Sequence, residues 1–88
     1  MTSSVTFGQL GQLLLDLGFE DQTDEYLVFR HATPGALVRM ALHEASEPVL
    51  ERDLVKVRKL LELTNLLECD KFDQWVLESK RQHEAAAG

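Results

Sequence analysis

The segment that decides the fold is Asp24–His31, DEYLVFRH, in which apolar and polar side chains alternate. Successive side chains of a strand point to opposite faces of a sheet, so Leu27 and Phe29 share one face. Tyr26 and Arg30 lie on the other face. The alternation therefore predicts a strand with one core face and one mixed face.

A hairpin follows this segment. Pro34-Gly35 suits the central positions of a type II turn, because proline presets φ and glycine accepts a positive φ. Together with the alternation, the turn predicts strands over Phe19–Gln22, Glu25–His31 and Ala36–His43. The core face then holds Leu27, Phe29, Val38, Met40 and Leu42, and the outer face holds Tyr26, Val28, Arg30, Leu37, Arg39, Ala41 and His43.

A segment with apolar residues at helical spacing precedes the strands. Thr6 and Gln9 have the spacing of a capping box, in which each side chain accepts a backbone N–H of the other residue. Gly18 can take the left-handed conformation that ends a helix. We therefore expect a helix over Phe7–Leu17.

The last third of the chain predicts two more helices. Glu51–Leu63 carries apolar residues at helical spacing, and Asn65 is a suitable left-handed stop. We expect Asp70 to cap the next helix. The apolar stripe of that helix is formed by Phe72, Trp75, Val76 and Ser79.

The resulting order is α-β-β-β-α-α, which belongs to the α+β class. It predicts a three-stranded antiparallel sheet packed on two helices, with an additional C-terminal helix. A chain of 88 residues fits a single domain over residues 1–88. We expect a core over about residues 5–80 and mobile ends at residues 1–4 and 83–88.

Composition limits the function. The formal net charge of -6 argues against general, non-specific nucleic-acid binding, because that binding depends on neutralising phosphates with lysine and arginine. A negative net charge does not exclude a local basic patch. The single cysteine, Cys69, and the absence of a signal peptide favour a cytoplasmic location. No apolar run approaches the roughly 20 residues that span a bilayer, so we expect no membrane partner. No metal-ligand spacing occurs, so we expect no metal and no cofactor.

Four stretches together resemble the HicA-type toxins of bacterial toxin–antitoxin pairs. They are LGF at the end of the first helix, VFRH in the second strand, MALH in the third strand, and DLVKVRKLLE in the following helix. The resemblance covers about residues 6–72. It implies a fold similar to double-stranded-RNA-binding domains, and an activity that cleaves messenger RNA and is neutralised by a partner antitoxin.

The resemblance also reveals a departure from the family pattern. HicA-type toxins carry Gly-Ser-His before the apolar end of the second strand, and that histidine is catalytic. Here Asp24, Glu25 and Tyr26 stand in those places. A phenol, with a pKa of about 10, is a poor proton acceptor at neutral pH, whereas an imidazole, at about 6.5, is a good one. We expect weak or no ribonuclease activity, with His43 as the remaining candidate catalyst.

Two functions stay open for the charged and outer-face residues. The first is RNA binding, in which cations contact phosphates and Tyr26 stacks on a base. The second is a protein-interaction module that forms a homodimer or binds a partner chain, such as an antitoxin-like protein, through the outer sheet face or the C-terminal helix. The alternative without a function is that this face is simply solvated surface. The candidate RNA- or partner-binding residues are Arg30, Arg39, Arg52, Lys56 and Lys59.

Overall fold

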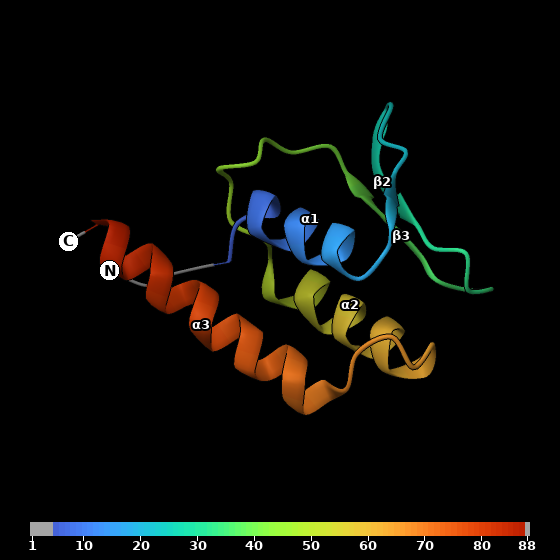
Figure 1. Ribbon diagram of the computed structural model, residues 1–88. Helices are drawn as coiled ribbons and strands as arrows, with labels where there is room; N and C mark the ends of the chain where they lie inside the picture. Colours follow the sequence, from blue (N-terminus) through green and yellow to red (C-terminus); the bar gives the residue numbers. More distant parts are fainter. Residues whose placement is uncertain (1–4, 88) are drawn as a thin grey trace.

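The computed structural model of the protein describes the backbone of residues 5–87 and the side chains of residues 5–81 (Figure 1). The predicted α+β order α-β-β-β-α-α is confirmed in this part of the chain. Residues 1–4 and Gly88, which we expect to be mobile, lie outside the described residues, and residues 83–87 belong to the last helix. The elements are α1 (Phe7–Asp16), β1 (Glu20–Asp21), β2 (Tyr26–Arg30), β3 (Leu37–Ala41), α2 (Glu51–Leu63) and α3 (Cys69–Ala87).

The three strands form one antiparallel sheet in the order β1-β2-β3. The predicted type II turn joins β2 to β3: the Thr33 carbonyl accepts from the Ala36 N–H at 3.1 Å, and Gly35 has a φ of 83°. The turn sets a register in which Phe29 lies opposite Val38. Both side chains are buried, so the predicted core face is confirmed.

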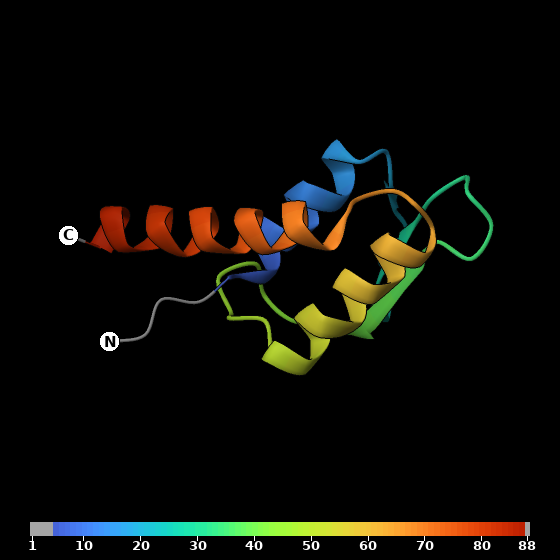
Figure 2. The ribbon, with the colours of Figure 1, turned by 90° about the horizontal axis from the view of Figure 1, so that it is seen from below.

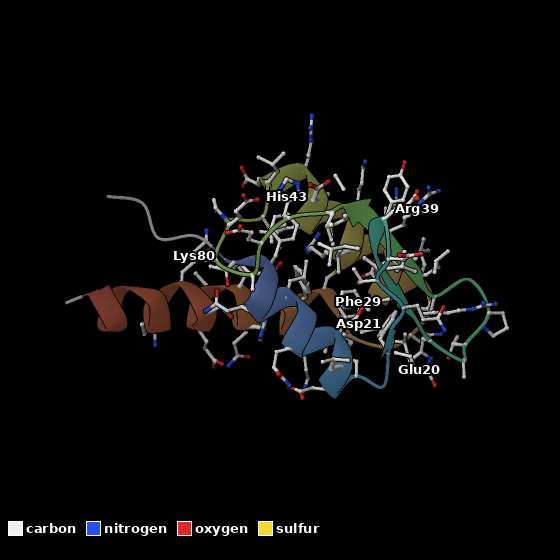
Figure 3. The ribbon with its side chains drawn as sticks, turned by 90° about the horizontal axis from the view of Figure 1, so that it is seen from above. Glu20, Asp21, Phe29, Arg39, His43 and Lys80 are labelled. Atoms are coloured by element: carbon white, nitrogen blue, oxygen red, sulfur yellow. The ribbon has the colours of Figure 1, made fainter. Side chains whose placement is uncertain are left out.

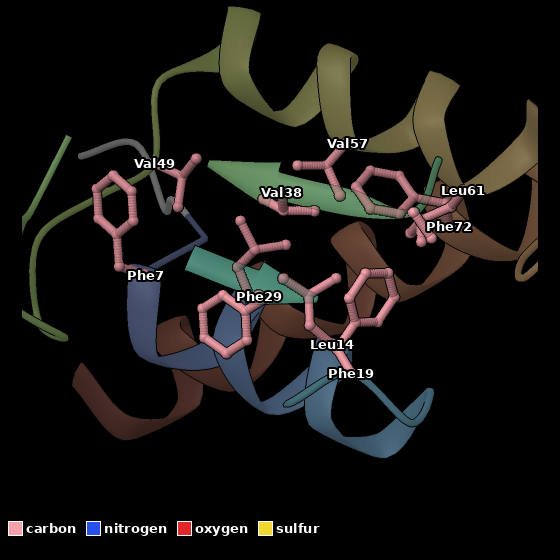
Figure 4. Packing of buried hydrophobic residues seen from close by; sticks show 11 residues of the cluster. Phe7, Leu14, Phe19, Phe29, Val38, Val49, Val57, Leu61 and Phe72 are labelled. Carbon is pink, nitrogen blue, oxygen red and sulfur yellow. The ribbon is translucent and has the colours of Figure 1, made fainter. Parts of the chain in front are cut away.

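The core lies between the helices and one face of the sheet (Figure 4). Phe29 approaches α1 where Gly11 has no side chain, since a Cβ there would lie 3.3 Å from the Phe29 ring. Helix α3 contributes Phe72 to the same core, so it is part of the packing and not only an appendage. The principal buried residues of the helices and strands are Phe7, Leu10, Leu14, Phe29, Val38, Val57, Leu61 and Phe72.

The segment after β3 is tied to the start of α1. The predicted capping box of Thr6 and Gln9 is present and satisfies one free N–H group of the helix. Two more donate to that segment: the Phe7 N–H to the Glu47 carbonyl and the Gly8 N–H to the Ala45 carbonyl, each at 2.9 Å. The chain from residue 42 to 49 is therefore drawn away from the sheet.

This attachment explains a difference from the sequence prediction. The third strand ends at Ala41, two residues before the predicted His43. Leu42, expected on the core face, is exposed. Both differences follow because residues beyond Ala41 turn towards α1 and leave the strand alternation.

The two C-terminal helices otherwise follow the sequence pattern. Asn65 adopts the expected left-handed conformation, with a φ of 58°. Asp70 was expected to cap α3, but this was wrong, because the helix already begins at Cys69 and the Glu68 carbonyl accepts from the Phe72 N–H in the first turn. The C-terminal part of α3 extends beyond α1 and α2 (Figure 2). No helix among the described residues is long and apolar enough to cross a membrane.

A pair of neighbouring substitutions tests the packing. Leu14 is fully buried in α1, whereas Leu15 beside it is exposed. We expect Leu14→Ala to lower the free energy of unfolding by about 2–5 kcal/mol, because it leaves a cavity in the core. Leu15→Ala, with the same chemical change, should alter it by less than about 0.5 kcal/mol. Urea unfolding of both variants, followed by circular dichroism, checks the difference, and equal destabilisation would contradict the assigned faces.

Candidate functional site

The outer face of the sheet carries a stacked pair. The Arg39 guanidinium lies 4.3 Å from the centre of the Tyr26 ring, in the geometry of a cation–π contact. Tyr26 is 45% exposed and Leu37 is 50% exposed. The predicted sharing of this face by Tyr26, Arg30, Leu37 and Arg39 is confirmed by the register of β2 and β3.

Strand β3 has a free edge in the described sheet. The Gln22 N–H donates to the Val28 carbonyl at 2.8 Å, so Val28 directs its backbone groups towards β1. The next residue, Phe29, directs its groups towards its partner Val38. Arg39, which follows Val38, then turns its N–H and C=O away from the sheet. The same alternation directs the backbone groups of Leu37, Arg39 and Ala41 outward, and of these the Leu37 N–H donates to the Gly35 carbonyl at 3.1 Å.

A groove of about 490 Å³, called here the β3–α2 groove, runs between this free edge and α2. It brings together three cations that the sequence separates, Arg39 from β3 and Arg52 and Lys56 from α2. His43 also lines the groove. Asp53 is the single carboxylate among the described residues that line it. A chain with a net charge of -6 therefore has a local excess of positive charge here.

The start of α2 opens onto the same groove. Its N-cap residue, Leu50, makes no side-chain capping hydrogen bond and lines the groove. The backbone N–H groups of the first turn thus lack the usual side-chain acceptor. Glu51 and Asp53 occupy that first turn and partly offset its positive end.

His43 does not share the outer face with Tyr26 and Arg30, and this part of the prediction was wrong. Its ring stacks on Phe7, with centroids 4.5 Å apart, and its Nδ1 hydrogen-bonds to the Glu47 carboxylate. The attachment of the following segment to α1 draws it there. Arg39 and His43 consequently lie apart in the structure, as Figure 3 shows.

Two of the predicted binding residues fall outside the groove. Arg30 stands at the end of β2 opposite Glu20, so its charge has an acidic neighbour on the same face. Lys59 is exposed on α2 but does not line the β3–α2 groove. Of the three candidate cations on α2, Arg52 and Lys56 therefore line the groove and Lys59 does not.

The surroundings of Cys69 do not favour a nucleophilic thiolate. A hydrogen bond to the Glu62 carboxylate, together with burial, raises the pKa of the Cys69 thiol, and nearby Arg58 offsets this only in part. A raised pKa reduces the reactive thiolate at neutral pH. Among the described residues no cluster of histidine, cysteine and carboxylate groups suits a metal ion.

No protein-family model matches the chain, and searches of curated proteins and of solved structures found no match either. The resemblance to HicA-type toxins therefore rests on the residues quoted for it. In the described part of the chain, the site is a groove with three cations beside the free edge of β3.

The sequence contains one spacing that relates to the position of His43. His43 and Glu47 are four residues apart, but this spacing indicates a pair only in a helix, and here the segment is irregular. Leu50 stands just before α2, which begins at Glu51 as predicted, and it is half exposed beside the groove.

The environment of Cys69 gives a testable prediction. We expect the thiol to react with a disulfide reagent more slowly at pH 8 than a cysteine in an unstructured peptide, because its pKa is raised. Glu62→Gln removes the carboxylate that stabilises the protonated thiol, so it should speed the reaction. Absorbance of the released thiol measures both rates. A slower reaction in Glu62→Gln would contradict the assigned cause.

Proposed function

We propose that this protein is a toxin-derived, HicA-like RNA-binding module that binds single-stranded RNA in the β3–α2 groove and cleaves it weakly or not at all. The observation that carries the proposal is the convergence of Arg39, Arg52 and Lys56 on one groove in an acidic chain. Phosphate neutralisation by such cations supplies most of the affinity for nucleic acid.

The neighbouring side chains suit an unpaired strand of RNA. Tyr26 is 45% exposed beside Arg39, and both aromatic rings and guanidinium planes stack on unpaired bases. The uncapped first turn of α2 adds backbone N–H groups at the same place as Arg52. Phosphates would follow the groove, and a base would stack beside Tyr26.

The expectation of weak catalysis rests on the separation of the acid–base groups. Cleavage through the 2′-hydroxyl needs one group to accept a proton and another to donate one to the leaving oxygen. Among the described residues that line the groove, His43 is the one imidazole, and its Nδ1 is engaged with Glu47. Tyr26 lies on the outer face of the sheet, apart from His43, so the two side chains do not form an acid–base pair.

A protein partner is the second candidate function, and the free edge of β3 favours it. An extended segment of another chain can add to such an edge as a further strand. Charge restricts the candidates, because an antiparallel copy of β3 centred on Arg39 would place two arginines opposite each other, which is destabilising. A partner strand with acidic residues would suit the groove better than a second β3.

Binding of a fluorescein-labelled single-stranded RNA, followed by anisotropy over a range of salt concentrations, tests the proposal. We expect the double variant Arg52→Ala/Lys56→Ala to bind more weakly and to reduce the slope of log K against log salt by about 1.4, since about 0.7 is lost per phosphate contact on single strands. Lys59→Ala is the matched control, from the same helix but outside the groove. Equal losses in both variants, or no binding by the native chain, would overturn the proposal.

Cleavage is a separate prediction. We expect the same RNA, incubated with the purified protein and analysed on a denaturing gel, to remain largely intact. His43→Ala should leave the RNA pattern close to that of the native chain. Rapid cleavage that His43→Ala abolishes would show that His43 acts alone as an acid or base and would contradict the expectation of weak activity.

A further inference from the structure

A second groove, independent of the first, lies between α2 and α3. It measures about 560 Å³ and shares no lining residue with the β3–α2 groove. Its walls carry Val55, which is 55% exposed, and Leu77, which is 61% exposed. Leu54 and Val76 beside them are half-buried. We call this surface the α2–α3 groove. Such an apolar surface between helices is typical of an interaction site.

Charged residues stand at the two ends of this groove in a regular arrangement. Arg58 of α2 forms a two-bonded ion pair with Asp73 of α3, at 2.9 and 3.1 Å. Glu51 precedes Arg58 by seven residues on α2, and Lys80 follows Asp73 by seven residues on α3. Seven residues are about two helical turns, or about 10 Å.

The two helices run in opposite directions (Figure 1). Because Arg58 pairs with Asp73 at one end of the groove, Glu51 and Lys80, seven residues away on each helix, lie towards the other end. Each end therefore carries one acid and one base. On α2 the acid comes first and the base follows. On α3 the order is the same.

The apolar residues lie at the centre of this charge pattern. The midpoint between Glu51 and Arg58 falls at Leu54 and Val55. The midpoint between Asp73 and Lys80 falls at Val76 and Leu77. A two-fold axis through the middle of the groove would therefore bring the apolar residues of two copies together.

We propose that the α2–α3 groove is the interface of a two-fold homodimer. The axis places Glu51 of one protomer beside Arg58 of the partner subunit, and Lys80 beside Asp73 of the partner subunit. Each of these two contacts occurs twice by symmetry, and all four join opposite charges. An isologous contact requires a self-complementary surface, and this groove provides one.

The two parts of the interface have different roles. Burial of the apolar centre supplies the affinity, because exposed ion pairs at a rim add little. The charges restrict the orientation of the second copy, because Glu51 over Glu51 or Arg58 over Arg58 would join like charges. The proposal is independent of RNA binding, because the two grooves share no lining residue.

Sedimentation equilibrium of the full chain tests the proposal first. We expect a concentration-dependent mass that rises from 10.0 kDa to twice that value. Leu77→Glu should shift the chain to the monomer, because it places a charge in the apolar centre. Leu63→Glu is the matched control, since Leu63 is 72% exposed on α2 and does not line the groove. Circular dichroism confirms that each variant is folded.

A charge exchange tests the orientation of the two copies. In one variant, Glu51→Lys and Lys80→Glu reverse one end of the groove. In a second, Arg58→Glu and Asp73→Lys reverse the other end and keep an opposite-charge pair within the chain. Each variant alone should be monomeric, because every contact in its homodimer joins like charges. An equimolar mixture should form a heterodimer, in which every contact again joins opposite charges.

The outcomes are distinct. Dimers of the native chain and of the mixture, with monomers of each charge variant alone, would support the two-fold interface. A native chain that stays monomeric at millimolar concentration would overturn it. Dimers that survive Leu77→Glu would overturn it as well, by locating the contact on another surface. A native monomer that binds an amphipathic helix of another protein in this groove would assign the surface to a different partner and also overturn the proposal.

Discussion

The pairing of Phe29 with Val38 across β2 and β3 is the constraint on which the rest of the structure depends. Both side chains are buried under the helices, so a shift of one residue would turn the core face to solvent. The Pro34-Gly35 turn fixes this register from one end, and Gly11 lets α1 approach the Phe29 ring from the other side. The residues of the outer face and the position of the free edge both follow from that pairing.

The same register decides what the surface can do. It sets Tyr26 beside Arg39 on the outer face and leaves the backbone of Arg39 free at the edge of the sheet. The segment after β3 then satisfies the N–H groups at the start of α1 and holds His43 against Phe7. The hydrogen bonds that cap α1 therefore hold His43 away from the outer face of the sheet, where the sequence had placed it as a candidate catalyst.

The sequence predicted much of the fold because its signals are local. The capping box at Thr6, the turn at Gly35 and the stop at Asn65 each depend on residues within one turn of each other. The position of His43 depends instead on hydrogen bonds between residues about 40 positions apart, which alternation does not reveal. The grooves were missed for the same reason, since α2 contributes Arg52 to one wall while a different element supplies the other.

The central claim is that RNA occupies the β3–α2 groove and leaves the remaining surface free. Titration of the ¹⁵N-labelled protein with a short single-stranded RNA, followed by amide chemical shifts, tests it most directly. The account predicts shifts that concentrate on residues 37–43 and on the first two turns of α2 from Glu51, with little change along α3. Shifts confined to the α2–α3 groove, or none at any concentration of RNA, would contradict it.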